Sequence, residues 1–234
     1  MPQDRNTGVA ASSASPATDD MTPDNLDSLE APGLGLIAGR RSIRRYVAGT
    51  LDHGLVEQVL SAAAWAPSAH NRQPWRFALL ASPAWKERLA RAMGERLGAD
   101  RLADGDDPGA VARDVARSFA RISAAPVVIL VCLTMVEMDR YPDLRRRDAE
   151  RLMAIQSTAM AMQNLLLAAH ALGLGAAVMC APLFCGETVA ATLGLPASWE
   201  PQGLVTLGFP ADCGKPPIRR PLAACVWRPE GESA

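Results

Sequence analysis

Histidine is scarce in this chain, and its scarcity removes several classes of catalyst. The three histidines, His53, His70 and His170, are far apart in the sequence. No serine or cysteine stands in a nucleophile elbow of the G-x-S-x-G type. Cys180 and Cys185 have four residues between them and no histidine motif beside them, so no zinc site is expected. The sequence therefore supports neither a hydrolytic triad nor a metal centre.

Signals for export or membrane insertion are also missing. The five cysteines are an odd number, which argues against a disulfide framework. The N-terminus has neither the basic start nor the apolar run of a secretory signal, and it is too acidic for a transit peptide. No segment reaches the roughly 18 uncharged apolar residues expected of a membrane span. We therefore expect a cytoplasmic protein with reduced thiols and no membrane association.

A strong net charge is absent as well. The chain has 24 basic and 25 acidic residues, but residues 1–30 hold six of the acids and only one arginine. Without that segment, 23 basic and 19 acidic residues remain, an excess of about +4. Such an excess is too mild for a nucleic-acid-binding protein, yet it is compatible with an anionic small-molecule ligand.

The chain divides into a tail and one domain. Residues 1–32 are rich in Ser, Thr, Ala, Pro and Asp, so they cannot bury enough apolar surface to fold and are expected to be disordered. Residues 33–234 are long enough for one globular domain with a sizeable core. Prolines near its end favour an extended C-terminal arm from about residue 212.

Hydrophobic periodicity and capping residues predict an α+β fold in which helices cover both faces of a mixed sheet. Helices are expected to open after Asp52, Ser82 and Asp107, where a capping side chain precedes the apolar pattern. A helix at about 150–172 is apolar nearly all round, which is typical of burial on every side, at a domain centre or a subunit interface. The remaining expected elements are a first helix ending near 65, a short helix at 186–194, and strands at 75–81, 126–132, 176–179, 204–207 and 223–227.

A dense polar turn lies between Pro67 and Pro74, which end the first helix and open the first strand. Amide side chains donate and accept hydrogen bonds at once, so they suit the edge of a heteroaromatic ring. An ordinary polar connection is the alternative. The neutral hydrogen-bonding side chains of this turn are Ser68, His70, Asn71 and Gln73.

Four arginines and a serine occupy the six residues from Arg40 to Arg45. Guanidinium groups match phosphate oxygens bidentately, and a serine hydroxyl adds a further donor. Taken alone, such a run is more often a solvated or nucleic-acid-facing patch. Together with the polar turn, it indicates a ligand that carries a phosphate at one end and a polar ring at the other.

These motifs resemble the nitroreductase family of FMN-dependent oxidoreductases. The matching residues are Arg40-Arg41-Ser42-Ile43-Arg44, Pro67-Ser68-Ala69-His70-Asn71-Arg72-Gln73-Pro74-Trp75, and a third block from Gly173-Leu174-Gly175 through Leu195-Pro196 to Gly208-Phe209-Pro210. Within that block, Trp199-Glu200-Pro201-Gln202-Gly203 is most similar to the nitroreductase-like C-terminal domain of deazaflavin coenzyme gamma-glutamyl ligases. The resemblance extends over about residues 40–228.

The resemblance implies a three-layer α/β/α sandwich with a mostly antiparallel sheet, in an intertwined homodimer that holds FMN in two interface clefts. It assigns the FMN phosphate and ribityl chain to the arginine run and the pyrimidine edge to the polar turn. No catalytic side chain is implied, because the hydride chemistry belongs to the cofactor. The implied cofactor-binding residues are Arg40, Arg41, Ser42, Arg44, Ser68, His70, Asn71, Gln73, Lys215 and Arg219.

The implied activity is hydride transfer from NADH or NADPH, or a reduced deazaflavin, to a small nitro compound, quinone or enone by a ping-pong mechanism. One alternative is reduction of a dehydro form of the deazaflavin coenzyme precursor. Flavin binding without turnover, and a flavin-consuming reaction of the same superfamily, are further alternatives.

The charged stretch around Arg145–Arg147 lies where the resemblance is weakest. A solvated helix start is the favoured interpretation, since acids flank the three arginines. The alternative is recognition of an anionic acceptor, for which at most two of three consecutive helical residues can face one cleft. The candidate substrate-contacting residues are His70, Arg72, Arg145 and Arg146.

Overall fold

A four-stranded sheet forms the centre of the protein, which a computed structural model describes over residues 32–229. The strands are β1 (Trp75–Leu80), β2 (Val127–Leu133), β3 (Gly175–Met179) and β4 (Glu200–Gly208), in the order β1-β2-β4-β3. All three ladders are antiparallel, and an isolated parallel bridge joins Ser42 to Ala176. The expected α+β architecture is confirmed.

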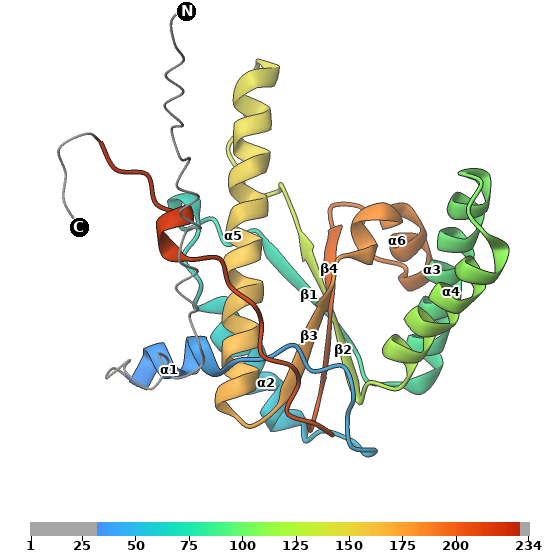
Figure 1. Ribbon diagram of the computed structural model, residues 1–234. Coiled ribbons are helices and arrows are strands. Elements are labelled where there is room, and N and C mark those ends of the chain that lie inside the picture. The colour runs from blue at the N-terminus through green and yellow to red at the C-terminus, as the bar shows by residue number, and fades with distance from the viewer. Residues whose placement is uncertain (1–31, 230–234) are drawn as a thin grey trace, which may run out of the picture.

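Alternating side chains of β2 support a helical layer on each face of the sheet (Figure 1). Val127, Ile129 and Val131 pack with α2 (His53–Ala64) and α5 (Leu144–Ala171). The residues between them pack with α3 (Pro83–Ala103), α4 (Pro108–Ser123) and α6 (Gly186–Leu193). Every residue of β2 is buried, which explains its uninterrupted apolar sequence.

Capping carboxylates define three helix starts. Asp52 and Asp107 cap α2 and α4 as predicted, by accepting hydrogen bonds from backbone N–H groups in the first turns. Asp143 caps α5 in the same way and was not predicted. The Ser82 hydroxyl makes no such bond, so its predicted capping role is wrong, and Pro83 alone marks the start of α3.

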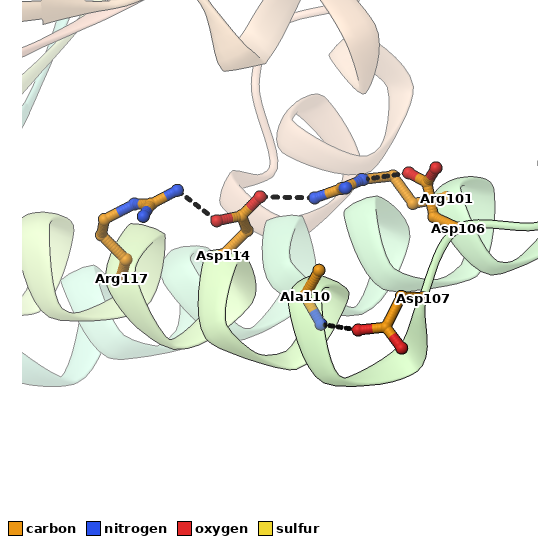
Figure 2. A network of polar contacts seen from close by, with 6 residues as sticks. All are labelled: Arg101, Asp106, Asp107, Ala110, Asp114 and Arg117. Carbon is orange, nitrogen blue, oxygen red and sulfur yellow. Dashed lines mark hydrogen bonds and ion pairs between the residues drawn. The ribbon is translucent and has the colours of Figure 1, made fainter.

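An ionic network stabilises the α3–α4 hairpin at the end where the loop connects the two helices (Figure 2). Arg101 donates to Asp106 and Asp114 at 2.6 and 2.5 Å, and Asp114 also pairs with Arg117. These contacts join the loop between the two helices to the side of α4.

The long helix differs from its predicted form in two respects. It begins at Leu144 rather than near 150, because Asp143 caps it there, so the charged stretch is its first turn. It is also not covered on every side in one chain, since Leu152 and Met160 are 54% and 38% exposed. By length and composition α5 could cross a membrane, but a core helix meets the same criterion, and α5 packs on α2, β2 and β3.

The two ends of the domain complete the fold. Residues 1–31 of the predicted tail lie outside the described part of the chain, whereas Pro32 already belongs to α1 (Pro32–Gly39). The predicted strand at 223–227 is wrong. Its place is taken by the short 3-10 helix η4 (Leu222–Ala224) and irregular exposed chain, because no strand lies beside it to pair with. The arm that carries η4 is exposed over residues 216–229.

Candidate functional site

A basic cavity of about 670 Å³ forms where the arginine run meets the start of the C-terminal arm. Ser42 and Ile43 attach the run to the edge strand β3, where the Ile43 N–H donates to the Ala176 carbonyl at 3.0 Å. The buried Ile43 side chain anchors it, so the polar side chains on either side face outward. We call this site the arginine pocket; its lining residues are Arg40, Arg41, Ser42, Arg44, Arg45, Asp212, Cys213, Gly214, Lys215, Pro217 and Arg219.

The arginine pocket brings together residues from opposite ends of the sequence. Arg40, Ser42 and Arg44 meet Lys215 and Arg219 there, although more than 160 positions separate the two groups. Burial, with the neighbouring guanidinium groups of Arg219 and Arg41, lowers the pKa of Arg40. Because these positive charges repel one another, an anion bound among them is stabilised.

Asp212 and Gly214 are pocket residues that the sequence analysis missed. The Asp212 carboxylate accepts from Arg45 Nε at 2.6 Å and from the Gly214 N–H at 2.9 Å, which joins the two walls. Arg45 and the Gly214 N–H hold the pKa of Asp212 below its usual value. Gly214 has φ = +69° and approaches Ile43 and Arg41 closely, so its place suits glycine. The sequence Asp212-Cys213-Gly214 could have indicated a turn at this position, since Asp and Gly are typical turn residues.

Arg41, at the border of the pocket, also binds backbone carbonyls. Its Nη1 donates to the carbonyls of Ala38 and Arg40 at 2.6 and 3.0 Å, at the C-terminal end of α1. Beneath it lies His170, near the end of α5. Burial and then the charges of Arg40 and Arg41 lower the pKa of His170. The lowered pKa favours the neutral form of His170, which adds no further positive charge beside the arginine run.

The polar turn presents its side chains from a backbone with three left-handed residues. His70, Asn71 and Gln73 have φ between +49° and +54°. This backbone conformation is uncommon for residues other than glycine and clusters at functional sites. The Gln73 N–H donates to Ser68 Oγ at 3.1 Å, and Gln73 Nε2 lies 3.3 Å from Asn71 Oδ1. The turn is fastened to α5 because the Ala69 N–H donates to Ser157 Oγ at 3.2 Å.

The polar turn and the arginine pocket lie against different parts of α5. The turn contacts Ser157, whereas His170 lies beside Gly39 and the arginine run. About thirteen positions separate Ser157 from His170, which corresponds to roughly 20 Å along the helix axis. Within one chain the two predicted halves of the site therefore do not converge on one point.

The candidate substrate residues fall near the N-terminal half of α5. Arg72, beside the polar turn, pairs with Asp139 in the loop before α5. Arg146 pairs with Asp143, and its guanidinium lies 5.0 Å from the centre of the Tyr141 ring. Arg145 is exposed, as is His70 on the polar turn.

A second, larger cavity of about 960 Å³ lies between the loop before α5, the N-terminal half of α5, α6 and the loop before β4. Glu200 of this cavity forms a two-point ion pair with Arg151 on α5, which fastens the start of β4 to that helix. We call it the Trp199 cavity; its lining includes Leu133, Met135, Val136, Asp139, Arg140, Tyr141, Arg147, Glu150, Glu187, Trp199, Glu200 and Pro201.

Comparison with known proteins agrees with this architecture. A protein from Thermus thermophilus named NADH dehydrogenase is 34% identical over 215 residues, covering 81% of this chain and 92% of that protein. A crystal structure from Desulfovibrio desulfuricans, described as a nitroreductase in complex with FMN, is 30% identical with a TM-score of 0.68, covering 87% and 99% of the two chains. A BluB-like flavoprotein from Clostridium difficile shares the fold, with 21% identity, a TM-score of 0.70 and coverage of 84% and 98%.

The family model that matches extends over residues 37–209 and is that of the nitroreductase family. The matched segment begins just before the arginine run, includes all four strands, and ends at Phe209, ahead of the arm. The chain therefore belongs to the nitroreductase family and is an oxidoreductase of the nitroreductase type.

Proposed function

We propose that the protein binds FMN and transfers a hydride from NADH or NADPH to a small organic acceptor such as a nitro compound, a quinone or an enone. The observation that carries this proposal is the arginine pocket, in which six basic side chains surround a single carboxylate. The FMN in the Desulfovibrio desulfuricans structure and the name of the Thermus thermophilus relative agree with it.

The residues of the arginine pocket fit the phosphate of FMN. Arg40, Arg44, Lys215 and Arg219 supply charge-assisted donors, and the Ser42 hydroxyl supplies a short neutral one. Asp212 is held by Arg45, so its charge does not oppose a phosphate directly. Bound FMN supplies the hydride acceptor and donor, while the chain orients the ring and leaves room for substrates in turn.

The pyrimidine edge of the ring is assigned to Ser68, His70, Asn71 and Gln73 of the partner subunit in a homodimer. The separation of roughly 20 Å along α5 motivates this assignment, because one chain does not bring its own turn to its own pocket. Apolar side chains exposed along α5 and the arm, including Leu152, Met160, Ile218 and Trp227, give the association a driving force.

On the acceptor side we propose that His70 and Arg72 lie near the substrate and that the first turn of α5 selects anionic acceptors through Arg145 and Arg146. The ion pair with Asp143 weakens the attraction of Arg146 for other anions, so the protein should favour only acceptors with several negative charges. Reduction of a dehydro deazaflavin precursor and flavin binding without turnover are the competing functions.

The deciding experiment is a visible spectrum of the purified protein followed by anaerobic turnover. We expect about one FMN per chain, bleaching on addition of NADH or NADPH, and recovery of the oxidised spectrum when a quinone is added. A protein that stays colourless after incubation with FMN contradicts the cofactor assignment. Bleaching by a reduced deazaflavin alone favours the precursor reductase, and a flavin that no donor reduces favours a binding protein.

A further inference from the structure

Glu150, which lines the Trp199 cavity, has a carboxylate oxygen without a partner in the described part of the chain. Glu150, on α5, is 1% exposed, and its Oε1 accepts from the Asp139 N–H at 3.0 Å. Its Oε2 is buried and has no hydrogen-bond partner within residues 32–229. A buried acceptor left unpaired is costly, so this oxygen favours any ligand that brings an N–H or O–H group to it.

The walls of the cavity suit a flat ring. Trp199, Tyr141 and Pro201 supply aromatic and apolar surface, and Leu133 closes the side toward the sheet. A volume of about 960 Å³ lies in the range of small-molecule sites, which are largely apolar with few polar groups. The arginine pocket differs in kind, since most of its lining residues are charged and none is aromatic.

The rim of the cavity has a positive character. Arg140 and Arg147 are exposed there, and neither forms an ion pair in the part of the chain that the structure describes. Two of the acids on the lining are already neutralised, because Asp139 pairs with Arg72 and Glu200 with Arg151. Glu187 is then the one exposed acid that lines the cavity together with the two arginines. An anionic group at the outer end of a ligand would therefore meet uncompensated guanidinium groups.

We propose that the Trp199 cavity is a ligand site for a small planar molecule with an N–H or O–H donor at its inner end and an anionic group at its outer end. Glu150 Oε2 accepts the inner donor, Trp199 and Tyr141 flank the ring, and Arg147 meets the anion. This site goes beyond the proposed hydride transfer, because binding to it requires neither FMN nor turnover.

Three related probes test the proposal on the full chain as purified. 4-Hydroxybenzoate has both end groups, benzoate lacks the donor, and phenol lacks the anion. Ligand-observed NMR titration measures weak binding of each probe. We expect 4-hydroxybenzoate to bind at least about tenfold more tightly than benzoate, as a hydrogen bond to a buried and otherwise unpaired acceptor would give. Equal affinities, or no binding by any probe, overturn the proposal without the need for a variant.

Substitutions then locate the contacts. Glu150→Gln keeps the acceptor for the Asp139 N–H but replaces the free oxygen by a donor, so it should abolish the advantage of 4-hydroxybenzoate over benzoate. Arg147→Ala should weaken both acids a few-fold and leave phenol unchanged, and this loss should shrink in salt. Glu187→Gln is the matched control, since Glu187 lines the same cavity but is exposed.

The control defines the outcomes. Glu187→Gln should leave the affinity of 4-hydroxybenzoate unchanged or slightly higher. If Glu150→Gln preserves the order of the three probes, they bind elsewhere and the assignment is wrong. If Glu150→Gln fails to fold, as its thermal transition would show, the exposed Arg147→Ala variant decides the case, and an unchanged benzoate affinity there contradicts the proposal.

Discussion

Replacing Gly214 by alanine should distort the arginine pocket while leaving the domain folded. Gly214 has φ = +69°, and an added Cβ would lie 2.9 Å from Ile43 Cδ1 and 3.0 Å from Arg41 Cβ. Ile43 is buried against β3, and Arg41 Cβ is fixed by the backbone of the arginine run. The strain can therefore be relieved only by moving the arm, which carries Lys215 and Arg219, away from that run.

The expected magnitudes follow from two separate costs. A side chain in the left-handed region costs about 1–2 kcal/mol, and overpacking of this kind costs about 1–3 kcal/mol. Because the arm can peel away, the loss in the free energy of unfolding should be smaller than their sum. The loss in FMN affinity should be at least about tenfold, as expected when one charge-assisted phosphate contact worth about 1.5–3 kcal/mol is removed.

The matched control is Gly194→Ala. Gly194 has φ = +63° at the end of α6, but nothing lies within 4 Å of its added Cβ. It therefore carries the conformational cost without the clash, and it lies outside the arginine pocket. Flavin fluorescence titration and urea unfolding of both variants separate the two effects. If Gly214→Ala binds FMN as tightly as Gly194→Ala does, the close approach does not shape the cofactor site.

Four further predictions concern single features. Arg44→Ala should weaken FMN binding at least about tenfold, whereas Arg88→Ala, a surface arginine stacked over Trp85, should not change the dissociation constant in the same titration. The pKa of His170 is lowered in the folded chain, so its contribution to stability is present above its ordinary pKa of about 6.5 and is lost as pH falls below that value; His170→Gln should flatten the fall in thermal midpoint on acidification, and an unchanged slope would falsify the assignment. Deleting residues 221–234 should lower dimer stability and FMN retention together in sedimentation and absorbance measurements, and a stable FMN-loaded monomer would contradict the proposed dimer. Arg146→Ala should slow turnover of a polyanionic acceptor at low salt and leave a neutral quinone unaffected, while equal effects on both acceptors would mark Arg146 as ordinary surface.

The arginine pocket shows which parts of the site the sequence could predict. Arg40, Ser42 and Arg44 were identified by their density in a short run, and Lys215 and Arg219 by family resemblance. Side-chain chemistry of this kind is visible in a sequence. The contributions of Asp212 and Gly214 were not visible, because the Arg45–Asp212 hydrogen bond between the two walls and the close packing of Gly214 against Ile43 and Arg41 exist only after the chain has folded.

Two predicted elements differ from the structure, for different reasons. The segment 223–227 is apolar enough for a strand, but a strand needs a neighbour, and this segment pairs with none of the four strands of the described residues. The start of α5 was placed too late because its first turn is charged, although Asp143 caps it and the charges remain in solvent. Tertiary context decides the first case, whereas a local N-cap decides the second.

The geometry of α5 connects these observations to the quaternary structure. The helix is too exposed for the centre of a monomer, since Leu152 and Met160 face solvent. It contacts the polar turn through Ser157, and its His170 lies beside Gly39, which precedes the arginine run. Two copies of a helix related by a two-fold axis can cover each other's apolar faces and place the turn of one chain near the pocket of the other. The same exposed surface would therefore account both for the separation of the two half-sites and for their completion in a dimer.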